Sequence, residues 1–356
     1  MYMNCLIKIM NSQTLTFKNA SITGIVTFAG DKKVDFMSSF NEFNLTEKEA
    51  KRLSKVMGLS SRYIVSGEET TSDLCFEAAK KVLAGSNVSP NDIGGLIFVS
   101  QTPDFSCPAT AISIQNRLGL PIDSVCFDLR LGCSGFVYGL ASAYGFIEAG
   151  LNNILLCVGD VASKIVDTSD HTIAPIMGDA GSAILIQRKP SKSFFNLYSD
   201  GSGYKALIVP NSGLRKEESF SGAPSLMQMD GAEVFNFTLQ RVPNMIENIM
   251  DVASLDSSKI DHFVLHQPNK YILQNLKKRM NLEDSKVPYL TQSIYGNQNS
   301  ASIPGTINGF LSNDYSNKSL TSVVAGFGIG LSWGAAVIKT KNIYSPKTFH
   351  LSSNEN

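Results

Sequence analysis

The sequence predicts an α/β protein made of two related halves, with buried strands packed between helices. Its 356 residues are 43% hydrophobic and 17% charged, which excludes intrinsic disorder and suits two fused units of ordinary domain size. A helix–strand–loop pattern at residues 71–103 recurs roughly 166 residues later, at residues 242–268. Glycine-rich turns that lead into small, apolar strands also occur twice, at residues 178–186 and 326–338.

We therefore expect an internal duplication, with one half at residues 15–188 and the other at residues 195–341. Two unrelated helix–strand units can share this order by chance, but both copies end in a loop that contains Gln and Pro. Residues 342–356 are polar and are expected to form a mobile tail.

The repeated units are read from their hydrophobic spacing. In the first copy, Thr71–Ala84 has an apolar stripe at helical spacing, and Ile93–Val99 is a β-rich run. In the second copy, Val242–Ala253 is helical in pattern and Ile260–Leu265 is the matching strand. The segment Asn269–Met280 is predicted to be a further helix.

Composition excludes several classes of protein. Lys+Arg and Asp+Glu both number 31, so binding to nucleic acid through bulk positive charge is not expected. No apolar run reaches the ~18 residues of a membrane-spanning helix. Met1–Met10 contains a lysine and has no signal-peptide cleavage pattern. The sequence therefore predicts a soluble, cytoplasmic protein.

All six cysteines lie in the first 157 residues, and none forms a C-x-x-C pair. This distribution favours neither a disulfide framework nor a zinc site, so most of them are expected to be small buried hydrophobic residues. They are Cys5, Cys75, Cys107, Cys126, Cys133 and Cys157.

Cys133 differs from the others because a nearly uncharged segment, Ser134–Ala149, follows it. A helix that is apolar all round is buried in the core. Cys133 is expected in the first turn of that helix, between Gly132 and Gly135, where unpaired N–H groups and the helix dipole would stabilise a thiolate. The alternative is a structural core cysteine.

A nucleophilic cysteine needs partners, and the chain has four histidines. His266 ends the strand Ile260–Leu265, at the edge where sites of α/β proteins gather. The alternative for His266 is a buried histidine with a purely structural role. Residues 295–302 form a loop rich in side-chain amides, in which Asn297 is a further candidate.

Taken together, five short segments resemble motifs of the β-ketoacyl-acyl carrier protein synthase III family, which belongs to the thiolase superfamily. They occur in the family's order across about residues 15–340. The resemblance implies a thiolase-like fold, with two duplicated α/β halves in αβαβα layers. The matching segments are Cys133–Phe136, Gly178–Gly181, His266–Asn269, Gly296–Ser302 and Phe327–Gly334.

The resemblance also implies an activity. An acyl thioester would acylate Cys133, and malonyl-acyl carrier protein would then undergo a decarboxylative Claisen condensation with the acyl group. The backbone N–H groups of Cys133 and Ile329 would form an oxyanion hole, and His266 and Asn297 would hold the enolate. Thioesters of coenzyme A or acyl carrier protein would be substrates, and no metal or redox cofactor is implied.

Further residues take their expected roles from the family. Asn269 and Phe235 are expected to bind substrate. Phe105 and Cys107 lie on a loop that, in the family, crosses a homodimer interface and closes the partner's acyl pocket. Independently of the family, the helix after His266 carries a local basic patch in a chain of zero net charge, at Lys270, Lys277, Lys278 and Arg279, and acidic acyl carrier protein is expected to dock there. The alternative is a solvated helix end, where cations are favoured by the dipole.

Some residues depart from the family pattern. Pro268 replaces an alanine, and Ile329 replaces a glycine. The Trp and Arg that clamp the adenine of coenzyme A are missing, because the only tryptophan is Trp333 and Val56 stands at the arginine's position. Two rival functions therefore stay open: acyl transfer to a hydroxyl or amine without decarboxylation, and a non-catalytic partner subunit that binds acyl carrier protein.

Overall fold

The computed structural model describes residues 13–351, which form two stacked β-sheets. The segment Met1–Met10, in which no signal peptide is expected, lies outside the described residues. The six-stranded sheet has the order β15-β2-β8-β7-β5-β6, and the five-stranded sheet has the order β1-β9-β14-β13-β12. Two short hairpins, β3–β4 and β10–β11, complete the strands.

The strands of the six-stranded sheet, in spatial order, are Phe349–His350 (β15), Ala20–Ala29 (β2), Ala180–Arg188 (β8), Asn153–Asp160 (β7), Gly95–Val99 (β5) and Val125–Leu129 (β6). Those of the five-stranded sheet are Thr14–Phe17 (β1), Ser193–Ser199 (β9), Ser332–Lys341 (β14), Ser319–Gly328 (β13) and His262–Leu265 (β12). The short strands are Lys32–Asp35 (β3), Ser61–Ile64 (β4), Leu207–Ile208 (β10) and Gln228–Met229 (β11).

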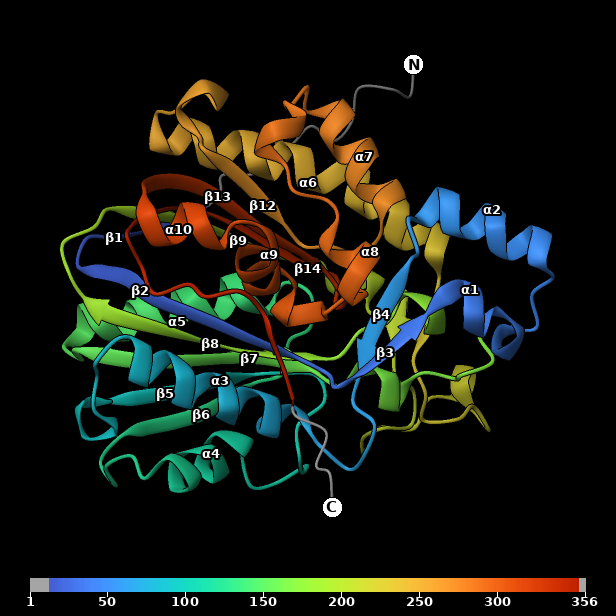
Figure 1. Cartoon of the computed structure of the whole chain (residues 1–356), viewed down its shortest axis with the longest axis horizontal. Coiled ribbons are helices and arrows are strands. Elements are labelled where there is room, and N and C mark those ends of the chain that lie inside the picture. Colours follow the sequence, from blue (N-terminus) through green and yellow to red (C-terminus); the bar gives the residue numbers. More distant parts are fainter. Residues whose placement is uncertain (1–12, 352–356) are drawn as a thin grey trace.

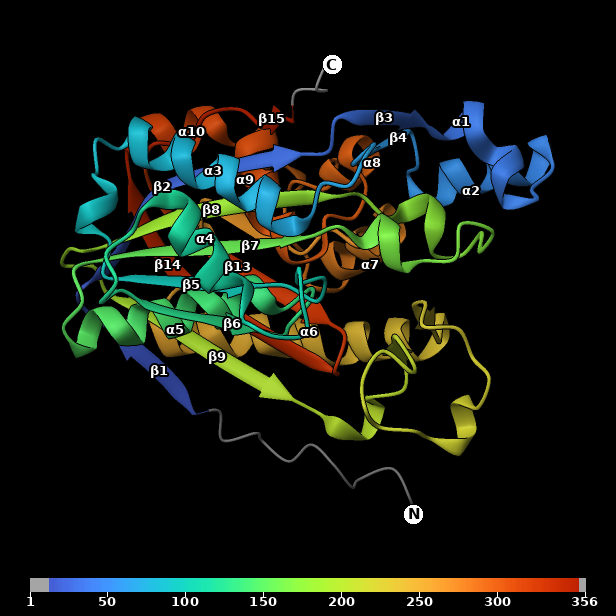
Figure 2. The ribbon, with the colours of Figure 1, turned by 90° about the horizontal axis from the view of Figure 1, so that it is seen from below.

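The helices form three layers around the two sheets (Figures 1 and 2). Helices α5 and α9 lie between the sheets, because each contacts strands of both. Helices α3 and α4 cover the outer face of the six-stranded sheet, and α6 covers the other sheet. Helix α7 packs beside α6 and shares the hydrophobic core under it. The α-helices are Phe36–Ser39 (α1), Glu47–Met57 (α2), Thr71–Gly85 (α3), Thr110–Leu118 (α4), Gly135–Ala149 (α5), Gly231–Ala253 (α6), Lys270–Arg279 (α7), Thr291–Tyr295 (α8), Ser302–Phe310 (α9) and Ser312–Asn317 (α10).

This arrangement explains why α5 is apolar all round. It packs against β5, β7 and β8 on one side and β9, β13 and β14 on the other, so most of the helix is buried or half-buried, and only Glu148 and Ala149 at its end are exposed. Phe136, Leu140 and Tyr144 are each at most 1% exposed. The αβαβα order of layers is the one expected from the sequence.

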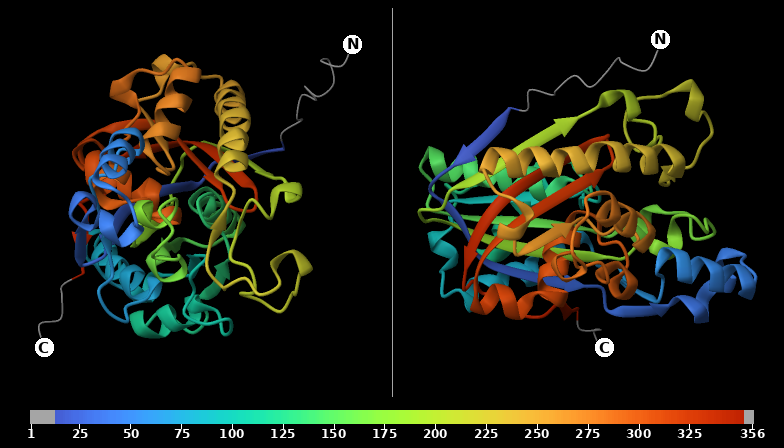
Figure 3. Two further views of the ribbon diagram at one scale, coloured as in Figure 1. Left: turned by 90° about the vertical axis from the view of Figure 1, so that its right-hand side faces the viewer. Right: turned by 90° about the horizontal axis from the view of Figure 1, so that it is seen from above.

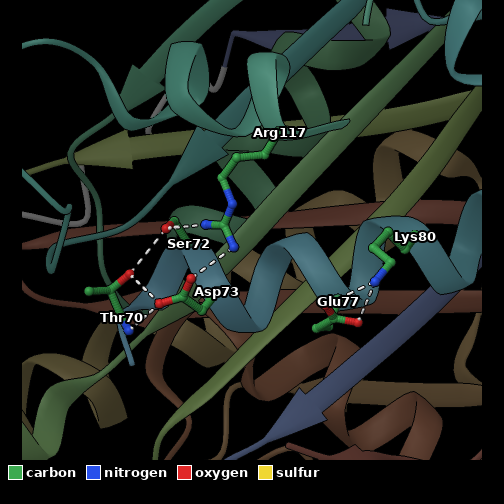
Figure 4. A network of polar contacts seen from close by, with 6 residues as sticks. All are labelled: Thr70, Ser72, Asp73, Glu77, Lys80 and Arg117. Atoms are coloured by element: carbon green, nitrogen blue, oxygen red, sulfur yellow. Dashed lines mark hydrogen bonds and ion pairs between the residues drawn. The ribbon is translucent and has the colours of Figure 1, made fainter. Parts of the chain in front are cut away.

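The start of α3 is fixed by polar side chains, which Figure 4 shows. The carboxylate of Asp73 accepts the backbone N–H of Thr70 at 2.8 Å and its hydroxyl at 3.1 Å, and the Asp73 N–H donates to the Thr70 carbonyl at 3.2 Å. Arg117 of α4 pairs with Asp73 at 2.8 Å and also donates to the hydroxyl of Ser72 at 3.1 Å. These contacts hold α3 and α4 together on the outer face of the six-stranded sheet.

The two sheets repeat one feature, an antiparallel strand pair in which glycines face each other. Gly159 of β7 is opposite Gly181 of β8, and Gly326 of β13 is opposite Gly334 of β14. At Gly181 an added Cβ would lie 2.7 Å from the backbone of Cys75 in α3, so the glycine allows the helix to approach the sheet closely.

The first and last strands of the described chain each join the sheet formed mainly by the other half of the sequence (Figure 3). Strand β1, near the N-terminus, joins the five-stranded sheet through β9, whereas β15, near the C-terminus, joins the six-stranded sheet through β2. Residues 342–351 were expected in a mobile tail, but they pack on the body of the protein. Ile343 is 4% exposed, and the Tyr344 backbone is hydrogen-bonded to Thr23 and Ile25 of β2.

One further difference concerns the length of a helix. The helix expected at residues 242–253 begins at Gly231, where the Asp230 side chain caps two backbone N–H groups, and it continues through Pro243.

No helix in the described part of the chain is both long and apolar enough to span a bilayer.

Candidate active site

Cys133 lies in the loop between β6 and α5, at the centre of the molecule. Ser134 is the N-cap residue of α5, so Cys133 precedes the helix rather than occupying its first turn. The residue is 6% exposed. The strand-to-helix turn expected from the sequence is therefore present, and its cysteine is buried between the two sheets.

Two backbone N–H groups, a glycine and a side-chain amide surround the thiol. The backbone N–H groups of Ile329 and Cys133 itself face the sulfur. A Cβ added at Gly328 would lie 2.9 Å from the sulfur, so only a glycine leaves the thiol room at this point. The side-chain oxygen of Asn299 is 3.8 Å from the sulfur and accepts its weak hydrogen bond.

The electrostatic state of Cys133 differs from the sequence-based prediction of a thiolate. Burial and the nearby carboxylate of Asp160 raise the pKa of the thiol to about 12, and the N–H groups of Ile329 and Cys133 only partly oppose them. The free cysteine is therefore a neutral thiol at pH 7. Burial therefore opposes the thiolate that the sequence led us to expect at this position.

His266 follows β12 directly and is held in place from both sides. Its backbone N–H donates to Ala325 of β13, and its Nδ1 lies 2.7 Å from the hydroxyl of Ser302. The residue is 2% exposed, and burial lowers the pKa of the imidazole to about 3. His266 is therefore neutral, with Nδ1 occupied by Ser302.

Asn297 lies in the amide-rich loop between α8 and α9. The loop is bound to the segment before β8, because Asn297 donates its backbone N–H to Ile176 and accepts that of Gly178, at 2.7 and 3.0 Å. The side-chain oxygen of Asn297 accepts the N–H of Asn299 at 3.0 Å. Asn297 lines the cavity, and its side-chain NH₂ group is the hydrogen-bonding group of the amide that this contact does not use.

Asp160, at the end of β7, ties this loop to the other half of the molecule. It is fully buried and accepts hydrogen bonds from Ser300 Oγ (2.7 Å), Gln101 N (2.8 Å), Ser300 N (3.1 Å) and Ser100 Oγ (3.2 Å). Burial raises the pKa of Asp160 to about 6 despite these bonds. Neither Asp160 nor Asn299 was singled out from the sequence, although Asn299 belongs to the same amide-rich loop as Asn297.

A cavity of about 370 Å³ brings the candidate residues together. Cys133, His266 and Asn297 all line it, together with Asn269 and Phe235. Asn269 also caps α7, because its side chain accepts the N–H of Ile272 at 2.9 Å. The remaining wall is mainly apolar and rich in methionine, formed by Met57, Ile176, Met177, Leu207, Met227, Met229, Val234, Ile272 and Phe327.

The other residues singled out from the sequence lie elsewhere. Phe105 is 62% exposed and lines a separate hollow of about 340 Å³, and Cys107 is exposed on the same loop. Trp333 is 3% exposed and stacks on Tyr198 in the core, so it does not face the cavity. Val56 is 44% exposed, next to the cavity residue Met57.

The four basic residues of α7 are spread along the helix. Lys270 stands in the first turn, beside the cavity residues Asn269 and Tyr271. The other three lie in the last turn. Lys277 pairs with Asp284, whereas Lys278 and Arg279 are exposed. No group of three or more metal-binding side chains occurs within residues 13–351.

Two stacked sheets around buried helices, with a cysteine just before one of these helices that lines the same cavity as a histidine and an asparagine, define a thiolase-type α/β protein. Comparison with known proteins agrees. Residues 127–201 match the family model of 3-oxoacyl-[acyl-carrier-protein] synthase III, and residues 250–340 match the model of its C-terminal domain.

The match extends to whole proteins. The chain is 35% identical over 344 residues to a putative 3-oxoacyl-[acyl-carrier-protein] synthase 3 of Campylobacter jejuni, covering 92% of this chain and 96% of that protein. It is 31% identical to the β-ketoacyl-[acyl-carrier-protein] synthase III of Clostridioides difficile, covering 90% and 98%. The crystal structure of a 3-oxoacyl-(acyl-carrier protein) synthase from Burkholderia xenovorans superimposes with a TM-score of 0.91 at 33% identity, covering 95% and 99%.

The chain belongs to the 3-oxoacyl-acyl carrier protein synthase III family, as its motifs indicated. It is an acyltransferase of the condensing type with the thiolase-like fold.

Proposed function

We propose that this enzyme condenses a Cys133-bound acyl group with malonyl-acyl carrier protein, and that His266 and Asn297 hold the enolate. The observation that carries the proposal is the orientation of Asn297. The N–H of Asn299 donates to the side-chain oxygen of Asn297. The NH₂ group of Asn297 therefore remains available as a donor, and Asn297 lines the same cavity as Cys133 and the neutral His266. Two neutral donors can stabilise an enolate oxygen.

The first half-reaction acylates Cys133. Burial keeps both the thiol and the imidazole of His266 neutral when each is considered alone. Transfer of the thiol proton to His266 creates two opposite charges in a site of low dielectric, and their mutual attraction offsets much of the cost of burial. The sulfur attacks the thioester carbonyl, and the departing thiolate takes the proton from His266.

The tetrahedral intermediate of this step carries a negative oxygen. The N–H groups of Cys133 and Ile329 are the donors nearest to it, since both face the sulfur. Only the backbone of Ile329 is used, and its side chain packs against Gly132. The branched residue at this position is therefore compatible with an oxyanion hole.

The second half-reaction forms the carbon–carbon bond. Malonyl-acyl carrier protein loses CO₂, and the electron pair of the broken bond passes into an enolate on the thioester oxygen. His266 and Asn297 donate to that oxygen. The enolate carbon attacks the acyl carbonyl, and Cys133 leaves as a thiolate. The sulfur then takes a proton from solvent, which replaces the proton that left with the first thiol. The hydroxyl of Ser302 can donate to or accept from His266 Nδ1, so the imidazole can act as a base in one half and as a donor in the other.

We further propose a cytoplasmic homodimer that uses thioesters of coenzyme A or acyl carrier protein, without a metal, redox cofactor or nucleic acid. Strand β6 is the edge of the six-stranded sheet. Near it, Phe105, Ile112 and Val125 are 62%, 47% and 40% exposed, which favours pairing of two copies at this edge. In such a dimer Phe105 and Cys107 would approach the partner's acyl pocket.

The docking surface proposed for acyl carrier protein consists of Lys270, Lys278 and Arg279 on α7. Lys277 contributes less, because Asp284 already pairs with it. A cation in the first turn of a helix is electrostatically unfavourable, so Lys270 is better explained by an acidic partner than by the helix itself.

The proposal is tested by incubating the enzyme with acyl-coenzyme A and [carboxyl-¹⁴C]malonyl-acyl carrier protein. We expect release of labelled CO₂ with formation of 3-oxoacyl-acyl carrier protein in equal amounts. An acylated small-molecule acceptor without CO₂ release would instead identify an acyltransferase. No acylation of Cys133 by any donor would identify a non-catalytic subunit.

A further inference from the structure

The C-terminal segment has no role in the reaction described above, although part of it packs beside the loop that carries Asn297. It comprises residues 342–351, which follow the residues that match the family model of the C-terminal domain, 250–340. Strand β15 of this segment pairs with β2 in parallel, and the ring of Phe349 stacks on that of Phe28 with 5.2 Å between the ring centroids. The end of the segment is therefore built into the edge of the six-stranded sheet.

The side chain of His350, in β15, completes a cluster of three aromatic rings. The centroid of its imidazole lies 4.3 Å from that of Tyr63 in β4 and 6.1 Å from that of Tyr295 at the end of α8. The centroids of the two tyrosine rings are 5.5 Å apart. The Nδ1 of His350 is hydrogen-bonded to the carbonyl oxygen of Gly30 at 3.2 Å, which orients the imidazole. His350 is exposed and both tyrosines are half-buried, so the imidazole shields part of their ring surface from water.

Tyr295 is separated from Asn297 by a single residue, Gly296. The carbonyl group of Tyr295 packs on Gly178, where an added Cβ would lie 2.0 Å from the Tyr295 oxygen. Gly178 in turn donates its N–H to the carbonyl oxygen of Asn297 at 3.0 Å. A displacement of Tyr295 therefore reaches Asn297 both along the chain and through Gly178.

The cluster has one fixed member, Tyr63, and one member that the C-terminal segment supplies, His350. Tyr63 is fixed because its carbonyl oxygen accepts the N–H of Asp179 at 2.8 Å. The ring of Tyr295 also reaches α9, where an added Cβ at Gly309 would lie 3.5 Å from it. Removal of the imidazole would open space beside both tyrosine rings and would let Tyr295 and the loop after it shift.

We propose that His350 is a positioning residue for the second half-reaction, and that it acts through Tyr295 on the loop that carries Asn297. The inference rests on the proposed role of Asn297 as a donor to the enolate. That role needs accurate placement, because a displacement of about 1 Å can cost about 100-fold in rate. The far end of the loop is fixed separately, since Ser300 donates to Asp160 at 2.7 Å. Loss of the imidazole should therefore disturb Asn297 and leave the nucleophile in place.

The test compares His350→Ala with the wild-type enzyme in each half-reaction separately. Release of labelled CO₂ from [carboxyl-¹⁴C]malonyl-acyl carrier protein measures decarboxylation, and intact-mass spectrometry measures single-turnover acylation of Cys133. We expect decarboxylation to fall by about 10-fold and acylation to change by less than about twofold. His350→Phe retains a ring that stacks on the tyrosines and should keep most of the wild-type decarboxylation rate. Lys347→Ala, exposed on the same segment, is the control and should match the wild type in both half-reactions.

A double-variant cycle distinguishes positioning from a contribution to stability alone. In the Asn297→Ala background, His350→Ala should cause no further loss of decarboxylation, because the donor that it positions is already absent. Melting temperatures show that each variant is folded. Equal losses of decarboxylation and acylation in His350→Ala, an unchanged decarboxylation rate, or an additive loss in the double variant would overturn the inference and leave the condensing function intact. If Asn297→Ala alone releases CO₂ at the wild-type rate, the proposed role of Asn297 fails, and the inference fails with it.

Discussion

The thiol of Cys133 donates a weak hydrogen bond to the side-chain oxygen of Asn299, with 3.8 Å between sulfur and oxygen. The two residues come from opposite halves of the molecule. Asn299 also fixes the orientation of Asn297 through its backbone N–H. One residue thus connects the nucleophile of the first half-reaction to a proposed enolate donor of the second.

The first prediction concerns this contact. Asn299→Asp places a carboxylate beside the thiol, and its negative charge should raise the pKa of Cys133 further. Asn299 has a φ of 48°, and Asp tolerates the left-handed region nearly as well as Asn. We expect alkylation of Cys133 by iodoacetamide at pH 9 to slow by about 10-fold or more, because each unit of pKa is a factor of ten in thiolate. Asn313→Asp, on the exposed face of α10, is the control. Equal rates in the two variants would exclude an electrostatic role for Asn299.

The second prediction separates the two half-reactions. Asn297→Ala should reduce decarboxylation of malonyl-acyl carrier protein by about 10²–10³-fold, the scale of losing one oxyanion donor, and should affect acylation far less. His266→Ala should impair both steps, because the thiol is protonated at neutral pH and needs a base. The measurements are labelled CO₂ release and single-turnover adduct formation. Acylation of His266→Ala at the wild-type rate would show that the thiol is activated without the imidazole.

The third prediction concerns pH. The pKa of Asp160 is raised from 3.8 to about 6, so the folded protein binds this proton more tightly than the unfolded chain does. The resulting stabilisation of the folded protein is complete below about pH 4 and is lost as the pH rises through about 6. Relative to Asp160→Asn, the wild-type free energy of unfolding should therefore fall by up to about 3 kcal/mol across this window.

Urea titrations at pH values from about 4 to about 7 measure this difference. The variant also loses hydrogen bonds to Ser300 or Gln101, but that loss shifts its stability equally at every pH. If the free energies of unfolding of the two proteins changed with pH in parallel, the pKa of Asp160 would not be raised by folding, and its burial would not disfavour the charged form.

The fourth prediction concerns docking. The double variant Lys270→Glu/Lys278→Glu should lower kcat/KM for malonyl-acyl carrier protein at low salt, because attraction to an acidic carrier mainly raises the association rate. Activity with a small malonyl thioester should be unchanged. The deficit should shrink at high salt, which screens exposed charges. Lys339→Glu/Lys341→Glu, exposed on β14, is the control. An equal loss on both substrates would mean that α7 has another role.

Much of the site was predictable from sequence because its reactive residues stand at the ends of elements with clear patterns. Cys133 follows a strand and precedes an apolar helix, and His266 ends a strand. Both features are local, so the motif and the hydrophobic spacing locate them. The resemblance to the family added Asn297, which the amide-rich loop alone did not identify.

What the sequence did not predict depends on contacts between distant segments. The neutral state of the thiol follows from Asp160 and from the enclosure by Gly328, neither of which is near Cys133 in the chain. The exchange of β1 and β15 between the sheets likewise has no local signal. Residues 342–351 are polar in composition, yet buried contacts of Ile343 and Tyr344 hold them against β2.

The central claim is that Cys133 carries the acyl group. It is tested by intact-mass spectrometry of the wild-type enzyme and of Cys133→Ser after incubation with a panel of acyl thioesters, followed by peptide mapping. We predict one adduct per chain in the wild type, located on Cys133, and none on Cys133→Ser. Addition of malonyl-acyl carrier protein should discharge the adduct as a 3-oxoacyl product. An adduct that persists in Cys133→Ser, for example on the exposed Cys107, would contradict the account.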